Sequence, residues 1–250
     1  MRLSKTKMVE GGNVWSISSN EAQLLVSSDS PIIHIYDSAL NITKNYDSKV
    51  KGPKSAIMLD SLIYIASSKG LMSLDTDNGI IKKIADGTFF VVRASKDGGS
   101  IFAGSTKGQV LKYYVNTNYS EILSIDPGNP VFDIKEHHNA LYIATQGGLF
   151  KFANDLATPL YTNQMVLSIS LYDDELLFGT GTSLEKVDIK SKDIKQIYTN
   201  NKPIFSIIQD DSIIVASSVN EIVIRNKKDN RNFLIGKEFG VQDEYNTHAI

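Results

Sequence analysis

The chain has 250 residues, of which 42% are hydrophobic and 22% are charged, and its formal net charge is −2 at pH 7. This length allows one large all-β domain or two ordinary domains. The near-neutral charge argues against a broad electrostatic attraction to nucleic acid or anionic lipid, so we expect neither as a partner. The absence of cysteine excludes disulfides and thiolate metal sites.

The N-terminal sequence MRLSKTKMVEGGNVWS lacks the continuous apolar stretch of a secretory signal. No window of the chain approaches the roughly 18 apolar residues of a membrane-spanning helix. We therefore expect a soluble cytoplasmic protein with no membrane partner.

An apolar run that ends in a small residue recurs along the chain, as LVSSDSPIIHI, IYIASSKGLMSL, IFAGSTKGQVLK, LYIATQGGLF, LFGTGTSLEKV and IVASSVNEIVI. The small residues follow one another at spacings of 39, 37, 41, 35 and 37 residues, and they are Ser27, Ala66, Ala103, Ala144, Gly179 and Ala216. A fixed period of about 38 residues indicates a repeat architecture whose unit has room for four short strands.

The second unit shows how each repeat divides. Its apolar segments KSAIML, LIYIASS, LMSLD and IIKKIA are separated by the turn sequences DS, KG and TDNG, which are strand and hairpin signals. The second strand of each unit is apolar on both faces, which an antiparallel strand shows only when both faces of its sheet are covered. We expect the small residue to let neighbouring sheets approach, and the residues after it to turn the chain into the third strand.

These features predict an all-β fold, a β-propeller of four-stranded antiparallel blades in one domain. The six predicted repeats cover residues 13–50, 51–87, 88–128, 129–163, 164–201 and 202–236. The termini, residues 1–12 and 237–250, are expected to help close the ring. A seventh blade built from both termini is the alternative.

The sequence ASSKGLMSLDTDNGIIKKI in the second unit resembles the WD-repeat family, and so do the pairs Tyr36-Asp37, Leu74-Asp75 and Val187-Asp188 at the ends of third strands. The resemblance covers residues 13–236. The chain departs from the family because it has no Trp-Asp pair, and the Gly-His pair is reduced to glycine alone. Another propeller family with short first strands such as NVWSI, PVFDI and PIFSI is the alternative.

A rigid ring of short loops favours a non-catalytic protein-interaction scaffold, an expectation that rests on analogy between folds. We expect its partners, proteins of unknown identity, to contact loops on one rim. The candidate loop residues are Asp29, Lys54, Lys69, Arg93, Lys107, Gln146, Gln164 and Lys202. Trp15, Phe132 and Phe205 begin first strands and are candidate anchors, with packing between blades as the alternative interpretation.

No catalytic residue, metal ligand or cofactor is predicted. The segments FGTGTSLE and DTDNG, and the acidic cluster at residues 173–175, all fall in hairpin-turn positions of the repeat. His137 and His138 also fall in a turn, and adjacent side chains on extended backbone point apart. The competing function is a small-ligand-binding or hydrolytic propeller with a site at the central channel, where Asp133 is the acidic residue expected within a first strand.

Overall fold

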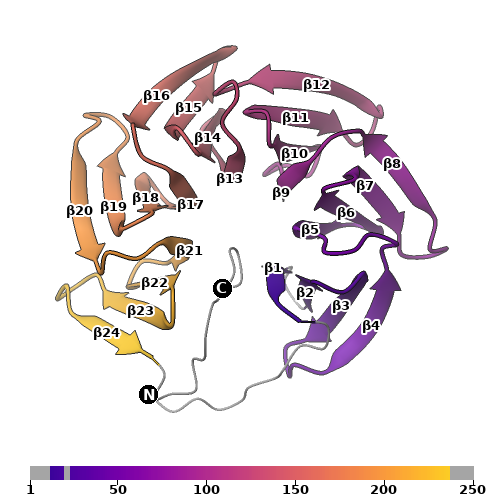
Figure 1. Ribbon diagram of the computed structural model, residues 1–250, viewed down its shortest axis with the longest axis horizontal. Helices are drawn as coiled ribbons and strands as arrows, with labels where there is room; N and C mark the ends of the chain where they lie inside the picture. The colour runs from indigo at the N-terminus through magenta and orange to yellow at the C-terminus, as the bar shows by residue number, and fades with distance from the viewer. Residues whose placement is uncertain (1–11, 20–22, 237–250) are drawn as a thin grey trace.

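The computed structural model describes residues 12–19 and 23–236. In this part of the chain all regular structure is β-strand, arranged as six four-stranded antiparallel sheets around an axis (Figure 1). Each sheet is built from four strands that follow one another in the sequence. The described residues form a six-bladed β-propeller, as predicted, and the alternative of a seventh blade falls on the termini, which lie outside them.

The first strand of every blade lies nearest the axis (Figure 1). These strands are β1 (Val14–Ser19), β5 (Ser55–Leu59), β9 (Phe89–Ala94), β13 (Val131–His137), β17 (Val166–Tyr172) and β21 (Ile204–Gln209). The second strands are β2 (Gln23–Ser28), β6 (Leu62–Ser67), β10 (Ser100–Ser105), β14 (Ala140–Thr145), β18 (Glu175–Thr180) and β22 (Ile213–Ser218).

The outer half of every blade is made by its third and fourth strands. The third strands are β3 (Ile32–Asp37), β7 (Gly70–Asp75), β11 (Gln109–Tyr114), β15 (Gly148–Ala153), β19 (Ser183–Asp188) and β23 (Glu221–Asn226). The fourth strands are β4 (Ile42–Asp47), β8 (Ile81–Ala85), β12 (Tyr119–Ser124), β16 (Leu156–Thr162), β20 (Ile194–Thr199) and β24 (Asn232–Ile235). Most residues of the fourth strands are exposed or half-buried, as suits edges that face water.

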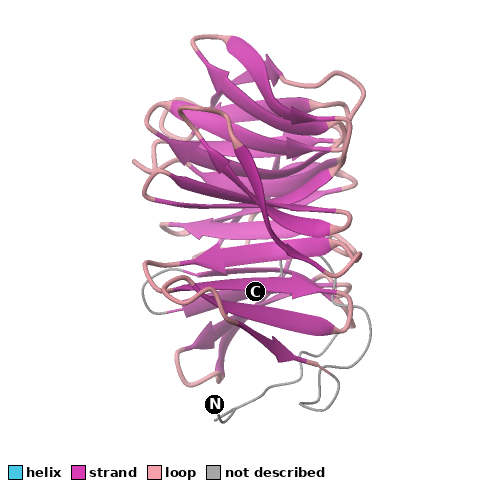
Figure 2. Cartoon of the chain, turned by 90° about the vertical axis from the view of Figure 1, so that its left-hand side faces the viewer, coloured by secondary structure: helices cyan, strands magenta, loops and turns pink. Residues whose placement is uncertain are grey.

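The turns gather on two opposite faces of the ring (Figure 2). The first strands begin at one face, here called the upper face, which also carries the turns between second and third strands. The first strands end at the other face, the lower face, which carries the turns between first and second strands. A residue near the start of a first strand therefore lies close to the upper face, and a residue near its end lies close to the lower face.

Apolar clusters hold neighbouring blades together. In one of them Leu25 and Ile33 of the first blade pack with Ile63 and Met72 of the second. Further clusters join the second blade to the third, the third to the fourth, the fourth to the fifth and the fifth to the sixth. Burying one such side chain contributes about 1.5–3 kcal/mol, so stability comes from the contacts between blades.

The sixth junction, between the β21–β24 blade and the β1–β4 blade, holds no apolar cluster formed by residues 12–19 and 23–236. The predicted role of the termini in closing the ring falls on residues 1–11 and 237–250, which lie outside the described part.

The small residue of each repeat sits where blades approach most closely. Ala66, Ala103 and Ala144 are each 0% exposed. At Gly179, a Cβ atom would lie 2.5 Å from the carbonyl oxygen of Ile204 in the next blade. Since real Cβ contacts do not become that short, the small residue permits the packing distance that the repeat pattern predicted.

Candidate functional site

Five of the six first strands carry a β-bulge at the same position, close to the upper face. In β13, Val131 pairs with Thr145 and Asp133 pairs with Ala144, which leaves Phe132 without a partner residue on β14. A bulge inserts one extra residue and redirects its side chain. The bulged residues, here called the bulge ring, are Trp15, Phe90, Phe132, Leu167 and Phe205.

The bulge ring joins the predicted anchors Trp15, Phe132 and Phe205 to two residues that the sequence reasoning missed, Phe90 and Leu167. The Phe90 and Phe132 rings stack across neighbouring blades, with centroids 6.0 Å apart and planes 11° apart. Leu167 is buried, whereas the four aromatic residues of the ring are only partly buried. The aromatic residues therefore combine packing between blades with a surface that is left open.

Two of the predicted loop residues, Asp29 and Lys54, hold the side chain of Trp15. Its indole Nε1–H donates to Asp29 Oδ1 at 2.7 Å, and Lys54 Nζ lies 3.3 Å from its ring centroid. Burial acts to raise the pKa of Asp29, but the hydrogen bonds from Trp15 and Asn13 outweigh it and lower the pKa. The carboxylate thus stays charged and holds the indole in one orientation.

The other predicted loop residues are spread around the upper face. Lys69, Lys107 and Gln146 lie in turns between second and third strands, while Gln164 and Lys202 lie just before first strands. Lys202 Nζ is 3.7 Å from Glu221 Oε2, and Gln164 Oε1 accepts a hydrogen bond from Tyr161. These five residues therefore lie in loops of the same face as the bulge ring. In the described part of the chain, no hydrogen bond or ion pair joins their side chains to one another.

Arg93 does not belong to a loop of this face, so its predicted placement is wrong. It is the fifth residue of β9, close to the lower face, because the strand runs on to Ala94. Its guanidinium donates to Asp133 Oδ1 at 2.7 Å. This ion pair lies in the channel wall and joins the third blade to the fourth.

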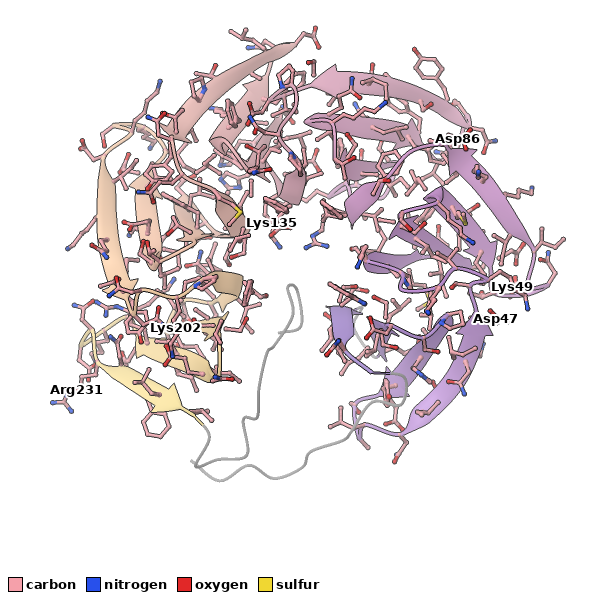
Figure 3. The ribbon with its side chains drawn as sticks, viewed as in Figure 1. Asp47, Lys49, Asp86, Lys135, Lys202 and Arg231 are labelled. Carbon is pink, nitrogen blue, oxygen red and sulfur yellow. The ribbon has the colours of Figure 1, made fainter. Side chains whose placement is uncertain are left out.

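A pocket of about 380 Å³ occupies the channel at the lower face. Its apolar lining includes Leu25, Ile57 and Ile207, while Arg93, Asp133 and Lys135 supply its charged groups. Figure 3 labels Lys135 beside the central opening, whereas Asp86 and Arg231 lie at the perimeter. The channel at this face therefore has a mixed lining of apolar and polar side chains, and its charged groups come from β9 and β13.

Asp133, the acidic residue expected in a first strand, is 3% exposed. Its Oδ1 accepts hydrogen bonds from Arg93 and from the backbone N–H of Ile134, and its Oδ2 accepts one from the Ile169 N–H at 3.1 Å. The carboxylate thus connects β9, β13 and β17. The same strand also contains Glu136, whose Oε2 accepts the Lys96 N–H on the lower face.

Of the two cations that line this pocket, Arg93 is paired with Asp133, whereas Lys135 forms no ion pair among residues 12–19 and 23–236. Burial lowers its pKa; the Asp133 charge opposes this effect and the Arg93 charge adds to it. Since the carboxylate of Asp133 is already held by three N–H donors, the Lys135 amine is the group with most capacity left for a ligand.

The segments interpreted as turns from the repeat pattern do contain turns, although His137 ends β13 and Glu175 begins β18. In DTDNG, Asp75 Oδ1 accepts the N–H of Asp77, and the Gly79 N–H donates to the Asp75 carbonyl. In FGTGTSLE, the Thr180 hydroxyl oxygen accepts the N–H groups of Thr182 and Ser183. Neither segment is followed by a helix.

Every second strand ends in a serine or threonine buried at the upper face, a repeat signal that the sequence reasoning did not use. Thr145 illustrates its role, because its Oγ1 accepts the N–H groups of Gly147 and Gly148 and donates to Asp126 Oδ2. The residues are Ser28, Ser67, Ser105, Thr145, Thr180 and Ser218. In five of them the hydroxyl oxygen accepts an N–H group of the turn into the third strand, whereas that of Ser218 accepts the side-chain amide of Asn200.

No protein-family model matches the chain, and no curated protein matches it. Solved structures match the fold, among them the computationally designed Ika8 protein, with a TM-score of 0.69. The sequences are 10% identical, and the alignment covers 89% of this chain and 73% of the Ika8 chain. A similarity at that identity shows the propeller fold alone. No helix of the described residues is long and apolar enough to cross a membrane.

Proposed function

We propose that the chain is a non-catalytic protein-interaction scaffold whose upper face binds a protein partner through the four aromatic residues of the bulge ring. The observation that supports this most strongly is the repetition of one bulge, with a large apolar residue, in five of six first strands. Bulges are typical of positions where a side chain is redirected for a purpose beyond sheet pairing. Aromatic anchors on a rigid frame supply contact area at a small entropic cost.

The contacts that hold the Trp15 indole in place support the same proposal. A partner that packs on the indole does not have to order it, since Asp29 and Lys54 already hold it. An interface that is ordered in advance loses less entropy on binding. The resemblance to WD repeats, in the Asp-capped turns after Tyr36 and Leu74, favours a platform of this kind by analogy. A cytoplasmic location is part of the proposal.

The test is affinity capture from cells of the source organism with three baits. The wild type is compared with the double variant Phe132→Ala/Phe205→Ala, and with Leu156→Ala, which removes a 64% exposed apolar side chain from an outer strand. We expect proteins that the wild type and Leu156→Ala retain in equal amounts and that the double variant loses. Equal capture by all three folded baits, or capture of nothing, contradicts the proposal.

A second candidate function is the binding of a small organic anion in the channel pocket, favoured by the Lys135 amine beside the apolar side chains of its lining. A ligand that binds only the folded state raises the melting temperature. A screen of small carboxylates and phosphates should therefore find a stabilising compound that acts on the wild type but not on Lys135→Met. No stabilisation by any compound, or equal stabilisation of both proteins, contradicts this function.

A further inference from the structure

Two histidines and one aspartate converge on the lower face, at the junction of the fourth and fifth blades. His137 Nε2 lies 3.0 Å from Asp174 Oδ1, and His138 Nε2 lies 3.4 Å from the same oxygen. One ligand atom from each of the three residues falls within 4.8 Å of the other two. The two nitrogen–oxygen distances of 3.0 and 3.4 Å are close to the roughly 3.3–3.6 Å that separates neighbouring ligands of a tetrahedral zinc ion with bonds of about 2.0–2.2 Å.

The backbone explains why two adjacent imidazoles point the same way. His137 ends β13 in extended conformation, but His138 has a φ of +45° and Asn139 a φ of +57°. The left-handed turn rotates the His138 side chain back towards its neighbour, so the two ring centroids are 3.8 Å apart. The expectation that these side chains point apart is therefore wrong, because it assumed an extended backbone at both residues.

The environment of the three residues suits metal ligation. His137 is 7% exposed, so its position is set by packing, while Asp174 and His138 are open to solvent. Because these two side chains are exposed, a solvent molecule has access to a fourth position.

We propose that His137, His138 and Asp174 bind a divalent transition-metal ion of the zinc class, with water as the fourth ligand. Two imidazoles and one carboxylate favour Zn²⁺, Co²⁺, Ni²⁺ or Cu²⁺ over Mg²⁺ or Ca²⁺, which require more oxygen ligands. The ion crosslinks the turn between β13 and β14 to the turn between β17 and β18. Its role is to fix two neighbouring blades on the lower face, which is separate from the proposed binding face.

The test uses isothermal titration of tag-free protein with zinc chloride in a buffer that does not bind zinc. The variants His138→Asn and Asp174→Asn each remove one exposed ligand, and asparagine tolerates the positive φ at residue 138. Asp173→Asn is the matched control, since it removes the neighbouring charge from the same turn and keeps all three ligands. Cobalt is a second probe because its visible absorption reports tetrahedral coordination.

We expect one zinc ion per chain in the wild type and in Asp173→Asn, with tetrahedral cobalt spectra in both. Each ligand variant should lose more than the roughly 10–100-fold in affinity that a change outside the ligand shell costs. Zinc at 100 times its dissociation constant should raise the melting temperature by about 5–10 °C in the wild type. No zinc binding, or equal losses in Asp173→Asn and Asp174→Asn, overturns the proposal.

Discussion

Replacement of Asp133 by alanine tests how the inner ring of strands is held together. The carboxylate is buried and accepts hydrogen bonds from Arg93 of the third blade and from the N–H groups of Ile134 and Ile169. Alanine leaves both backbone groups and the guanidinium without this acceptor. Arg93→Ala removes the same ion pair but leaves the carboxylate with its two backbone donors, so the two substitutions separate the charge pair from the backbone links.

The cost of Asp133→Ala follows from these contacts. A buried N–H group that loses its acceptor costs about 1–3 kcal/mol, and breaking a buried ion pair costs about 3–5 kcal/mol. These values are not additive, and the Arg93 side chain keeps 24% exposure, which lets water replace part of its lost contact. We therefore expect Asp133→Ala to lower the free energy of unfolding by about 3–5 kcal/mol, and Arg93→Ala to cost less.

Urea unfolding followed by circular dichroism and by the fluorescence of Trp15, the single tryptophan, measures both costs. Asp86→Asn is the control, because Asp86 forms an exposed pair with Lys83. Such pairs contribute about 0–1 kcal/mol. The reasoning is refuted if Asp133→Ala costs less than about 1 kcal/mol, or if Arg93→Ala costs as much as Asp133→Ala.

Two further substitutions test the packing and the charges between the fifth and sixth blades. Gly179→Ala should cost about 1–3 kcal/mol in urea unfolding, because its Cβ would strike a carbonyl oxygen of β21, while Gly181→Ala, which meets nothing within 4 Å, should cost little. Burial acts to raise the pKa of Glu175, but its bonds with Lys186 and Lys227 outweigh this and lower it. Glu175 therefore stabilises the folded state above the unfolded pKa of about 4.5, and the gap between wild type and Glu175→Gln should shrink as the pH falls below that value. Equal costs for the two glycines, or a gap that does not change with pH, would contradict these expectations.

The repeat predicted the fold because its signals are local. Each blade needs a small residue at a fixed place and short hairpin turns, and both leave a period in the sequence. Gly179 shows the link, since the same residue that marks the period also lets β21 approach. The six-bladed ring was therefore predictable from one chain without relatives.

The sites were predicted less well because they depend on pairing between strands and between blades. Phe132 was found from its type, but the bulge that exposes it depends on register with β14. Arg93 was assigned to a loop because the end of β9 has no sharp local signal. The meeting of His138 with Asp174 needs a positive φ and a neighbour about one repeat away, so an overlay of the six first turns is the signal that could have found it.

The claim that the upper face binds protein is tested most directly by site-specific photocrosslinking in cells of the source organism. A photoreactive phenylalanine analogue replaces Phe205 of the bulge ring in one version of the protein and Leu156 of the outer strand β16 in another. We predict a discrete crosslinked protein adduct from position 205 and none from position 156. No adduct from position 205, or the same adducts from both positions, would contradict the account.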